Sequence, residues 1–232
     1  MMSEITGLQP FCDSLLVFDT ETSGLRAGSD EIIEFSAVKL GWKDGKLRTV
    51  CEVDEFIRTS DDRALPLKIV ELTGITDELL RKEGIGKAEL SALLARLLTP
   101  RTMLVAYNAQ FDLLFLYYFL IKHGDAKLLQ NLPKLDLLTV YRDRYAFPHK
   151  LCNAITEYGL QDRVKNSHRA IDDVRATVEV MRAMDAERDD FAQYINVFGY
   201  SRRYGISGPR IRSVRYVPQG FEPDKPILVP NG

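Results

Sequence analysis

Apolar and polar positions alternate in short runs over the first part of the chain, and this pattern predicts β-strands. Stretches rich in turn-forming residues, SGLRAGSD and WKDGK, separate these runs. We therefore expect three strands joined by hairpins, at residues 14–19, 31–40 and 47–58. A later apolar run predicts a fourth strand at residues 102–107.

Helical spacing of apolar residues dominates the rest of the chain. The first helical stretch is interrupted at Thr73 and Gly74, and another is expected to begin at the cap residue Asn108 and to stop at Gly124. Asp136 is also expected to cap a helix, with a functional role as the alternative. The expected helices cover residues 65–82, 88–98, 109–122, 136–144, 151–158 and 170–187.

Strands and helices mix within one unit, which predicts the α/β class, with antiparallel strands first and parallel strands behind. The composition shifts near residue 190 towards glycine, arginine, tyrosine and proline. We therefore divide the chain into a domain at residues 1–188 and an extension of less regular structure at residues 189–232. The stretch GYSRRYGISGPRIRSVRYV in this extension carries five arginines and no acid. Three explanations fit it: a surface that tracks a nucleic-acid strand, a solvated loop packed on the domain, or a docking site for a polymerase or another partner.

The composition is that of a globular protein, with 45% hydrophobic residues, 28% charged residues and a formal net charge of -2. This charge argues against a protein that coats DNA but not against a local basic groove. The three cysteines show no CxxC spacing, which disfavours a disulfide framework or a zinc site and fits a reducing cytoplasm. Since the longest apolar run, residues 113–121, is too short to cross a bilayer and the N-terminus has no signal pattern, no membrane association is expected.

Two acids follow the first apolar strand, in the stretch LLVFDTETSGL. Alternate side chains of a strand share a face, so Asp19 and Glu21 are expected to project together where the strand runs out. A solvated strand end or a turn cap is the plain explanation for such a pair. The alternative is a site for a hard divalent cation such as Mg²⁺, because ligand sites of open α/β sheets lie at the carboxyl ends of strands.

A third acid, Asp112, lies in AYNAQFDLLFL and is the only charge between Met103 and Ile121. It is expected in the first turn of a helix, where it would complement the helix dipole. A carboxylate in so apolar a stretch needs a partner, and a metal ion would supply one.

The last cluster is SHRAIDDVRATVEVM, residues 167–181. Helical spacing places Asp172 nearly opposite the apolar face and Asp173 on its flank, able to look into a crevice beside the core. His168 lies at or ahead of the helix start, where a surface or capping role is the alternative to a catalytic one. The apolar face consists of Ile171, Val174, Val178 and Met181.

The series FDTETSGL, NAQFDLLFL and HRAIDDVRAT resembles, in order and separation, the three motifs of the DnaQ-like (DEDDh) 3′–5′ exonucleases. The resemblance covers about residues 13 to 186, including IVELTGITDELL, and is similar to the proofreading exonucleases of bacterial DNA polymerase III. It implies a ribonuclease H-like fold, in which helices flank a mixed five-stranded sheet of three antiparallel and then parallel strands.

The same resemblance implies the chemistry of the site. It assigns Asp19, Glu21, Asp112 and Asp173 as ligands of two Mg²⁺ or Mn²⁺ ions and His168 as the general base. The expected reaction releases 5′-mononucleotides from a nucleic acid with a free 3′ end, with DNA favoured over RNA and a DNA polymerase as a candidate partner. The residues implied in substrate binding are Thr22, Ser23, Leu25, Asn108 and Phe111. For the last two, a helix cap and a core aromatic are equally good explanations.

Two other functions stay open at this point. The same five catalytic residues also serve enzymes that trim RNA or hydrolyse short oligonucleotides. A noncatalytic module that binds nucleic acid or a polymerase is the third hypothesis, and five groups suited to metal-dependent hydrolysis count against it.

Overall fold

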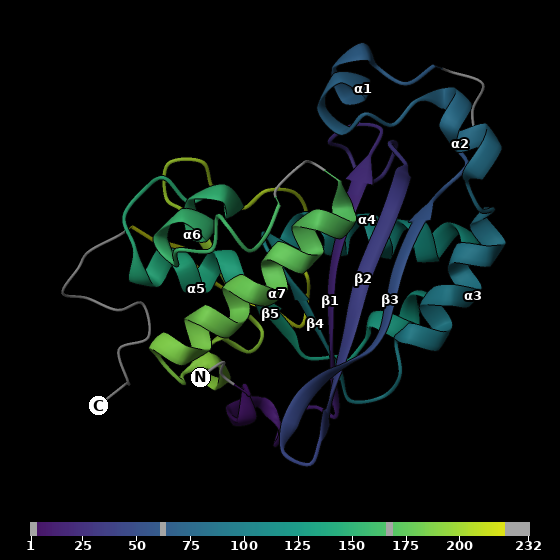
Figure 1. The fold of residues 1–232 in the computed structure, drawn as a ribbon. Helices are drawn as coiled ribbons and strands as arrows, with labels where there is room; N and C mark the ends of the chain where they lie inside the picture. Colours follow the sequence, from purple (N-terminus) through teal and green to yellow (C-terminus); the bar gives the residue numbers. More distant parts are fainter. Residues whose placement is uncertain (1–3, 61–63, 166–168, 221–232) are drawn as a thin grey trace.

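A five-stranded mixed sheet forms the centre of the molecule (Figure 1). The computed structural model describes residues 4–60, 64–165 and 169–220. The strands lie in the order β3-β2-β1-β4-β5, in which β1, β2 and β3 are antiparallel and β4 and β5 run parallel to β1. The α/β class and the mixed sheet predicted from the sequence are thereby confirmed. The strand bounds are β1 (Ser14–Thr22), β2 (Ile32–Lys43), β3 (Lys46–Phe56), β4 (Thr102–Ala106) and β5 (Lys134–Asp136).

Helices cover both faces of the sheet, which explains why β1 is apolar without interruption from Leu15 to Phe18. Because side chains alternate along a strand, Leu15 and Val17 pack in the core under α5, α6 and α7, while Leu16 and Phe18 pack under α3 and α4. The helices of these two layers are α3 (Lys87–Leu97), α4 (Ala109–His123), α5 (Leu137–Arg144), α6 (Leu151–Glu157) and α7 (Ala170–Glu187). None of the helices in the described ranges combines the length and apolar character of a membrane span.

Two short helices lie at the end of the sheet where β1 finishes (Figure 1). The first ends at Gly74, whose φ of 72° is the left-handed conformation that glycine adopts without strain. The predicted interruption at Thr73 and Gly74 is therefore a true helix end. These helices are α1 (Leu67–Thr73) and α2 (Asp77–Glu83), and single-turn 3₁₀ helices occur at η1 (Thr6–Leu8), η2 (Ala126–Leu129) and η3 (Phe191–Tyr194).

Two strands differ from the sequence prediction. The first was expected to end at Asp19, but β1 continues to Thr22 because β2 pairs with it along its whole length. Asp19 and Glu21 thus lie inside a strand and not beyond its end. β5 has three residues, too few for an alternating pattern to be recognised, and it was not predicted from the sequence.

The start of α4 also differs from its prediction. Asn108 occupies the N-cap position of α4, as predicted, but it has a φ of 73° and its side chain makes no capping hydrogen bond. The carboxylate of Asp136 takes this role, since its Oδ1 accepts hydrogen bonds from the backbone N–H groups of Asn108 (3.0 Å) and Ala109 (3.1 Å). Asp136 also caps α5, as predicted, by accepting from the Leu138 N–H (3.3 Å) and from Thr139 Oγ1 (2.6 Å).

The described part of the extension packs on the domain. Its two strands, β6 (Val197–Ser201) and β7 (Arg215–Gln219), form a parallel pair, so the expectation of less regular structure is wrong for these residues. The Asn196 N–H donates to the Lys134 carbonyl at 2.7 Å, and the Tyr216 hydroxyl donates to Gln110 Oε1 at 2.6 Å. Phe198 is buried in the core beside α4. Strands of five residues joined by a long crossover give a weak periodic signal, which is why the pattern did not indicate them.

We expect the replacement Asp136→Ala to lower the free energy of unfolding by about 3 kcal/mol, because it leaves the donors at the starts of two helices without an acceptor in the core. Urea denaturation measures this loss. The matched control is Asp125→Ala, which removes an exposed cap of η2 and should cost no more than about 1 kcal/mol. Equal losses in the two variants would contradict a joint capping role for Asp136.

Candidate active site

Three carboxylates from two distant segments meet on one face of the sheet. Asp19 and Glu21 share the face of β1 that carries Leu15 and Val17, which is the face covered by α7. Asp173, in the first turn of α7, reaches the same place, and carboxylate oxygens of the three residues all lie within 4.8 Å of one another. Helical spacing predicted this orientation of Asp173.

Asp112 reaches the same region from α4 because β4 is short. β4 pairs with β1 only as far as Val17, so the backbone of β1 beyond that residue needs other partners. The N–H of Thr20 and its hydroxyl both donate to Asp112 Oδ1, at 3.0 and 2.6 Å. Thr20 is thus a protein partner of the buried Asp112, and a metal ion as a second partner stays a prediction.

The acids raise one another's pKa values. Burial raises the pKa of Asp19 well above its usual range, and the neighbouring charges of Asp112, Glu21 and Asp173 raise it further. Burial and adjacent acids, Glu34 first among them, raise the pKa of Glu21 to about 8, while Arg169 lowers it by a smaller amount. Such a crowded group of hard oxygen donors is suited to a divalent cation.

One acid of this region was not predicted from the sequence. Glu34 lies opposite Glu21 in the pairing of β1 with β2 and is fully buried. Arg169 compensates its charge, since Arg169 Nε donates to Glu34 Oε1 at 2.9 Å and the guanidinium lies over the Phe56 ring at 4.8 Å. The N–H of Ala170, the first residue of α7, donates to Glu34 Oε2 at 3.1 Å. The sequence carried one signal that could have indicated this residue: Glu34 is a single acid within the apolar run of β2.

The structure separates the two acids of α7 as predicted. Asp172 pairs with Arg175 at 3.7 Å and lines a different cavity, together with Glu52 and Arg163. It is, however, partly buried and not fully solvated. His168 lies outside the described residues, so its role stays a prediction. Arg169, the next residue along the chain, is the first described residue of this segment.

The residues expected to contact substrate take different positions. The Thr22 hydroxyl donates to the Gly24 carbonyl at 2.6 Å, and Ser23 Oγ accepts from the Glu31 N–H at 2.9 Å, so both hydroxyls shape the turn after β1. The Leu25 side chain is 83% exposed and available for contact. Phe111 packs against Phe115 at 4.9 Å between ring centroids, as expected of a core aromatic.

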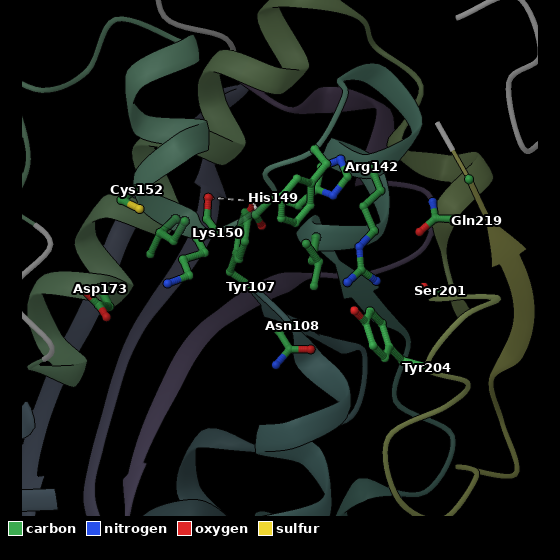
Figure 2. A pocket seen from close by; sticks show the side chains of 14 residues that line it. Tyr107, Asn108, Arg142, His149, Lys150, Cys152, Asp173, Ser201, Tyr204 and Gln219 are labelled. Atoms are coloured by element: carbon green, nitrogen blue, oxygen red, sulfur yellow. Dashed lines mark hydrogen bonds between the residues drawn. The ribbon is translucent and has the colours of Figure 1, made fainter. Parts of the chain in front are cut away.

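A cavity of about 770 Å³ adjoins the acids, and we call it the side cavity. Figure 2 shows Asp173 at one end of it and Arg142 with Tyr204 at the other. Asn108 also lines this cavity. Its other lining residues include Tyr107, Phe147, His149, Lys150, Ser201 and Gln219.

We expect Arg169→Gln to destabilise the protein by about 3 kcal/mol, because it leaves the buried Glu34 carboxylate without a cation. Urea denaturation tests this, and the double variant Arg169→Gln/Glu34→Gln should recover much of the loss. Arg175→Gln, within α7, is the control, since its pair with Glu52 is exposed and should contribute less than about 1 kcal/mol. Equal destabilisation by the two arginine substitutions would refute the special role of Arg169.

Known proteins match most of this chain in sequence and in fold. The sequence model of the exonuclease family (RNase_T) matches residues 16–181. The PolC-type DNA polymerase III of Clostridium perfringens is 34% identical over 177 residues, which are 75% of this chain and 11% of that protein. The PolC-type DNA polymerase III of Bacillus subtilis is 31% identical over 189 residues, 74% of this chain and again 11% of the relative. The chain thus spans about a tenth of the length of these curated relatives.

Solved structures show the same fold at low sequence identity. Exonuclease I of E. coli in complex with a dA16 oligonucleotide superposes with a TM-score of 0.68 and 20% identity. The match covers 78% of this chain and 42% of that one. Since the family model covers most of the chain, including all four acids, the chain belongs to the exonuclease family.

Proposed function

We propose that this chain removes 5′-mononucleotides from the 3′ end of DNA, with two divalent metal ions and a histidine general base. The observation that carries the proposal is the approach of Asp19, Glu21 and Asp173 to within 4.8 Å, with Asp112 hydrogen-bonded to the residue between the first two. Membership in the exonuclease family supports a phosphodiester substrate. The PolC-type polymerases among the relatives support DNA as the polymer and a DNA polymerase as a candidate partner.

The donor set fits a hard divalent ion such as Mg²⁺ or Mn²⁺. Carboxylate oxygens are the ligands that these ions prefer. Burial, and then repulsion from the neighbouring acids, raise the pKa of Asp19, and a nearby cation would stabilise its ionised form. We assign Asp19, Glu21, Asp112 and Asp173 as the ligands. When bound, two such ions would neutralise negative charge on the phosphodiester and on the attacking and leaving oxygens.

The remaining steps fall to protein groups. We assign His168 as the base that takes the proton of the attacking water, since histidine has a pKa near the working pH. The adjacent Arg169 is bound to Glu34, which anchors the chain directly beside this histidine. The exposed Leu25 is assigned to contact the terminal nucleotide, together with Thr22, Ser23, Asn108 and Phe111.

We expect Asp19→Asn to lower kcat/KM on single-stranded DNA by at least about 100-fold, since it removes a ligand from a site whose ions supply several kcal/mol of transition-state stabilisation. His168→Ala should cost about 100- to 10,000-fold and alter the pH profile. Release of labelled mononucleotide in Mg²⁺ or Mn²⁺ is the measurement, and a chelator should abolish it. Asp172→Asn is the matched control and should stay within about 3-fold of the parent.

Three outcomes separate the alternatives. Degradation that persists unchanged in Asp19→Asn points to a contaminating nuclease and contradicts the proposal. A much higher kcat/KM on an RNA strand than on DNA of the same sequence would favour the RNA-trimming function. Binding of DNA without any metal-dependent cleavage would favour a noncatalytic module.

We also expect the stability of the metal-free protein to fall as the pH rises from about 5 to about 8. The pKa of Glu21 is raised to about 8 and that of Asp19 is raised well above its value in the unfolded chain, so the folded state holds protons that the unfolded state has lost. The Tm measured across this range should decrease, and less so in Asp19→Asn. Millimolar Mg²⁺ should raise the Tm most at the alkaline end, because it binds the ionised form. A Tm that rises with pH in the absence of metal would contradict the raised pKa values of these two acids.

A further inference from the structure

The side cavity continues the candidate active site on the side away from β2 and β3. Asp173 lies at one end, Tyr107 and Asn108 from the turn between β4 and α4 form one wall, and α5 contributes Leu138 and Arg142. The loop that precedes α6 adds Phe147, His149 and Lys150. The Tyr107 hydroxyl donates to the His149 carbonyl at 3.0 Å and thereby joins these two walls (Figure 2).

The extension closes the other side of the cavity. Ser201, Tyr204 and Gln219 line it, and hydrogen bonds to α5 hold this part of the extension in place. The Gly199 N–H donates to Thr139 Oγ1 at 2.8 Å, and Gln219 Nε2 donates to the Thr139 carbonyl at 2.8 Å. Arg142 Nη1 donates to the Gly199 carbonyl at 3.2 Å. The wall formed by the extension is therefore fixed to the domain.

The charges of the cavity suit an anion. Arg142 and Lys150 supply two cations, and Asp173 is the single acid among the described lining residues. Burial lowers the pKa of His149, which leaves its ring neutral near pH 7. The side cavity is thus cationic directly beside a group of acids, as expected where a phosphate chain leaves a metal site.

Two large aromatic rings are exposed at this cavity. The Phe147 side chain is 84% exposed and that of Tyr204 is 79% exposed, and they come from separate segments of the chain. Exposed rings in one cavity mark a binding surface, and beside cations they suit stacked bases. The volume of about 770 Å³ lies within the range of about 300–1,000 Å³ for small-ligand sites, which suits one or two nucleotides and not a duplex.

We propose that the side cavity binds the unpaired nucleotides that precede the 3′-terminal one, with the bases stacked on Tyr204 and Phe147 and the phosphates beside Lys150 and Arg142. The inference rests on the proposed exonuclease function and adds Phe147 and Tyr204 to the residues that hold its substrate. It also gives the extension a role, since Tyr204 belongs to residues 189–232. Only unpaired bases offer their faces to these rings, so a blunt duplex is expected to be a poorer substrate.

Substrate length tests the proposal. We expect Tyr204→Ala and Phe147→Ala each to raise KM for a thymidylate dodecamer by about 5- to 100-fold, with kcat within about 2-fold of the parent. The p-nitrophenyl ester of thymidine 5′-monophosphate has no nucleotide before the terminal one, so both variants should hydrolyse it as the parent does. Tyr204→Trp should restore the low KM. Tyr117→Ala is the matched control, because its ring is 44% exposed but lines a different cavity.

The outcomes separate this inference from the proposed function. If the parent cleaves both substrates and Tyr204→Ala changes both equally or neither, the inference is overturned while the exonuclease function stands. If the parent cleaves nothing, the proposed function fails. Fluorescence anisotropy of the labelled dodecamer then tests the cavity alone, because each of the two substitutions should raise the Kd by the same factor as it was expected to raise KM. An effect of the two substitutions on a uridylate dodecamer but not on the thymidylate one would overturn the assignment to DNA.

Discussion

The repulsion between carboxylates that converge at β1 is the constraint on which the rest of the structure depends. Asp19, Glu21, Asp112 and Asp173 occupy a place from which water is partly excluded, where two unit charges about 4 Å apart interact by about 4 kcal/mol at an effective dielectric constant near 20. Without a bound cation such a group opposes folding. Strand pairing, core packing and the hydrogen bonds from Thr20 to Asp112 must therefore hold the acids together against this repulsion.

The structure treats its buried acids in two ways. Glu34 has a dedicated cation, Arg169, and a backbone donor at the start of α7, so its charge is satisfied within the protein. Asp112 receives two hydrogen bonds from Thr20, which orient it and favour its anionic form, while burial raises its pKa to about 7. Arg169 lowers the pKa of Glu21 by less than burial and the nearby acids raise it, so the pKa of Glu21 stays raised. This contrast separates an acid that anchors α7 from acids that are kept available for a cation.

Much of this arrangement could be predicted from local sequence patterns, and the exceptions have physical reasons. The face shared by Asp19 and Glu21 follows from strand alternation, and the orientation of Asp173 follows from helical spacing. The length of β1 could not be predicted, because pairing with β2 extends it through polar residues. Glu34 was missed because its partner, Arg169, is 135 residues away in the chain. Interactions that depend on such long-range contacts leave no periodic signal.

Asp136 connects the acids to the side cavity. Its carboxylate accepts from the N–H groups of Asn108 and Ala109, which fixes the start of α4 and hence the position of Asp112 one turn later. The same carboxylate accepts from Thr139, whose hydroxyl in turn accepts from the Gly199 N–H of the extension. One buried acid at the end of the shortest strand of the central sheet therefore sets both the start of the helix that carries Asp112 and the wall that carries Tyr204. Because Asp136 and Thr139 are buried, the spacing between the acids and the aromatic wall is a property of the folded domain, and a bound strand would not have to create it.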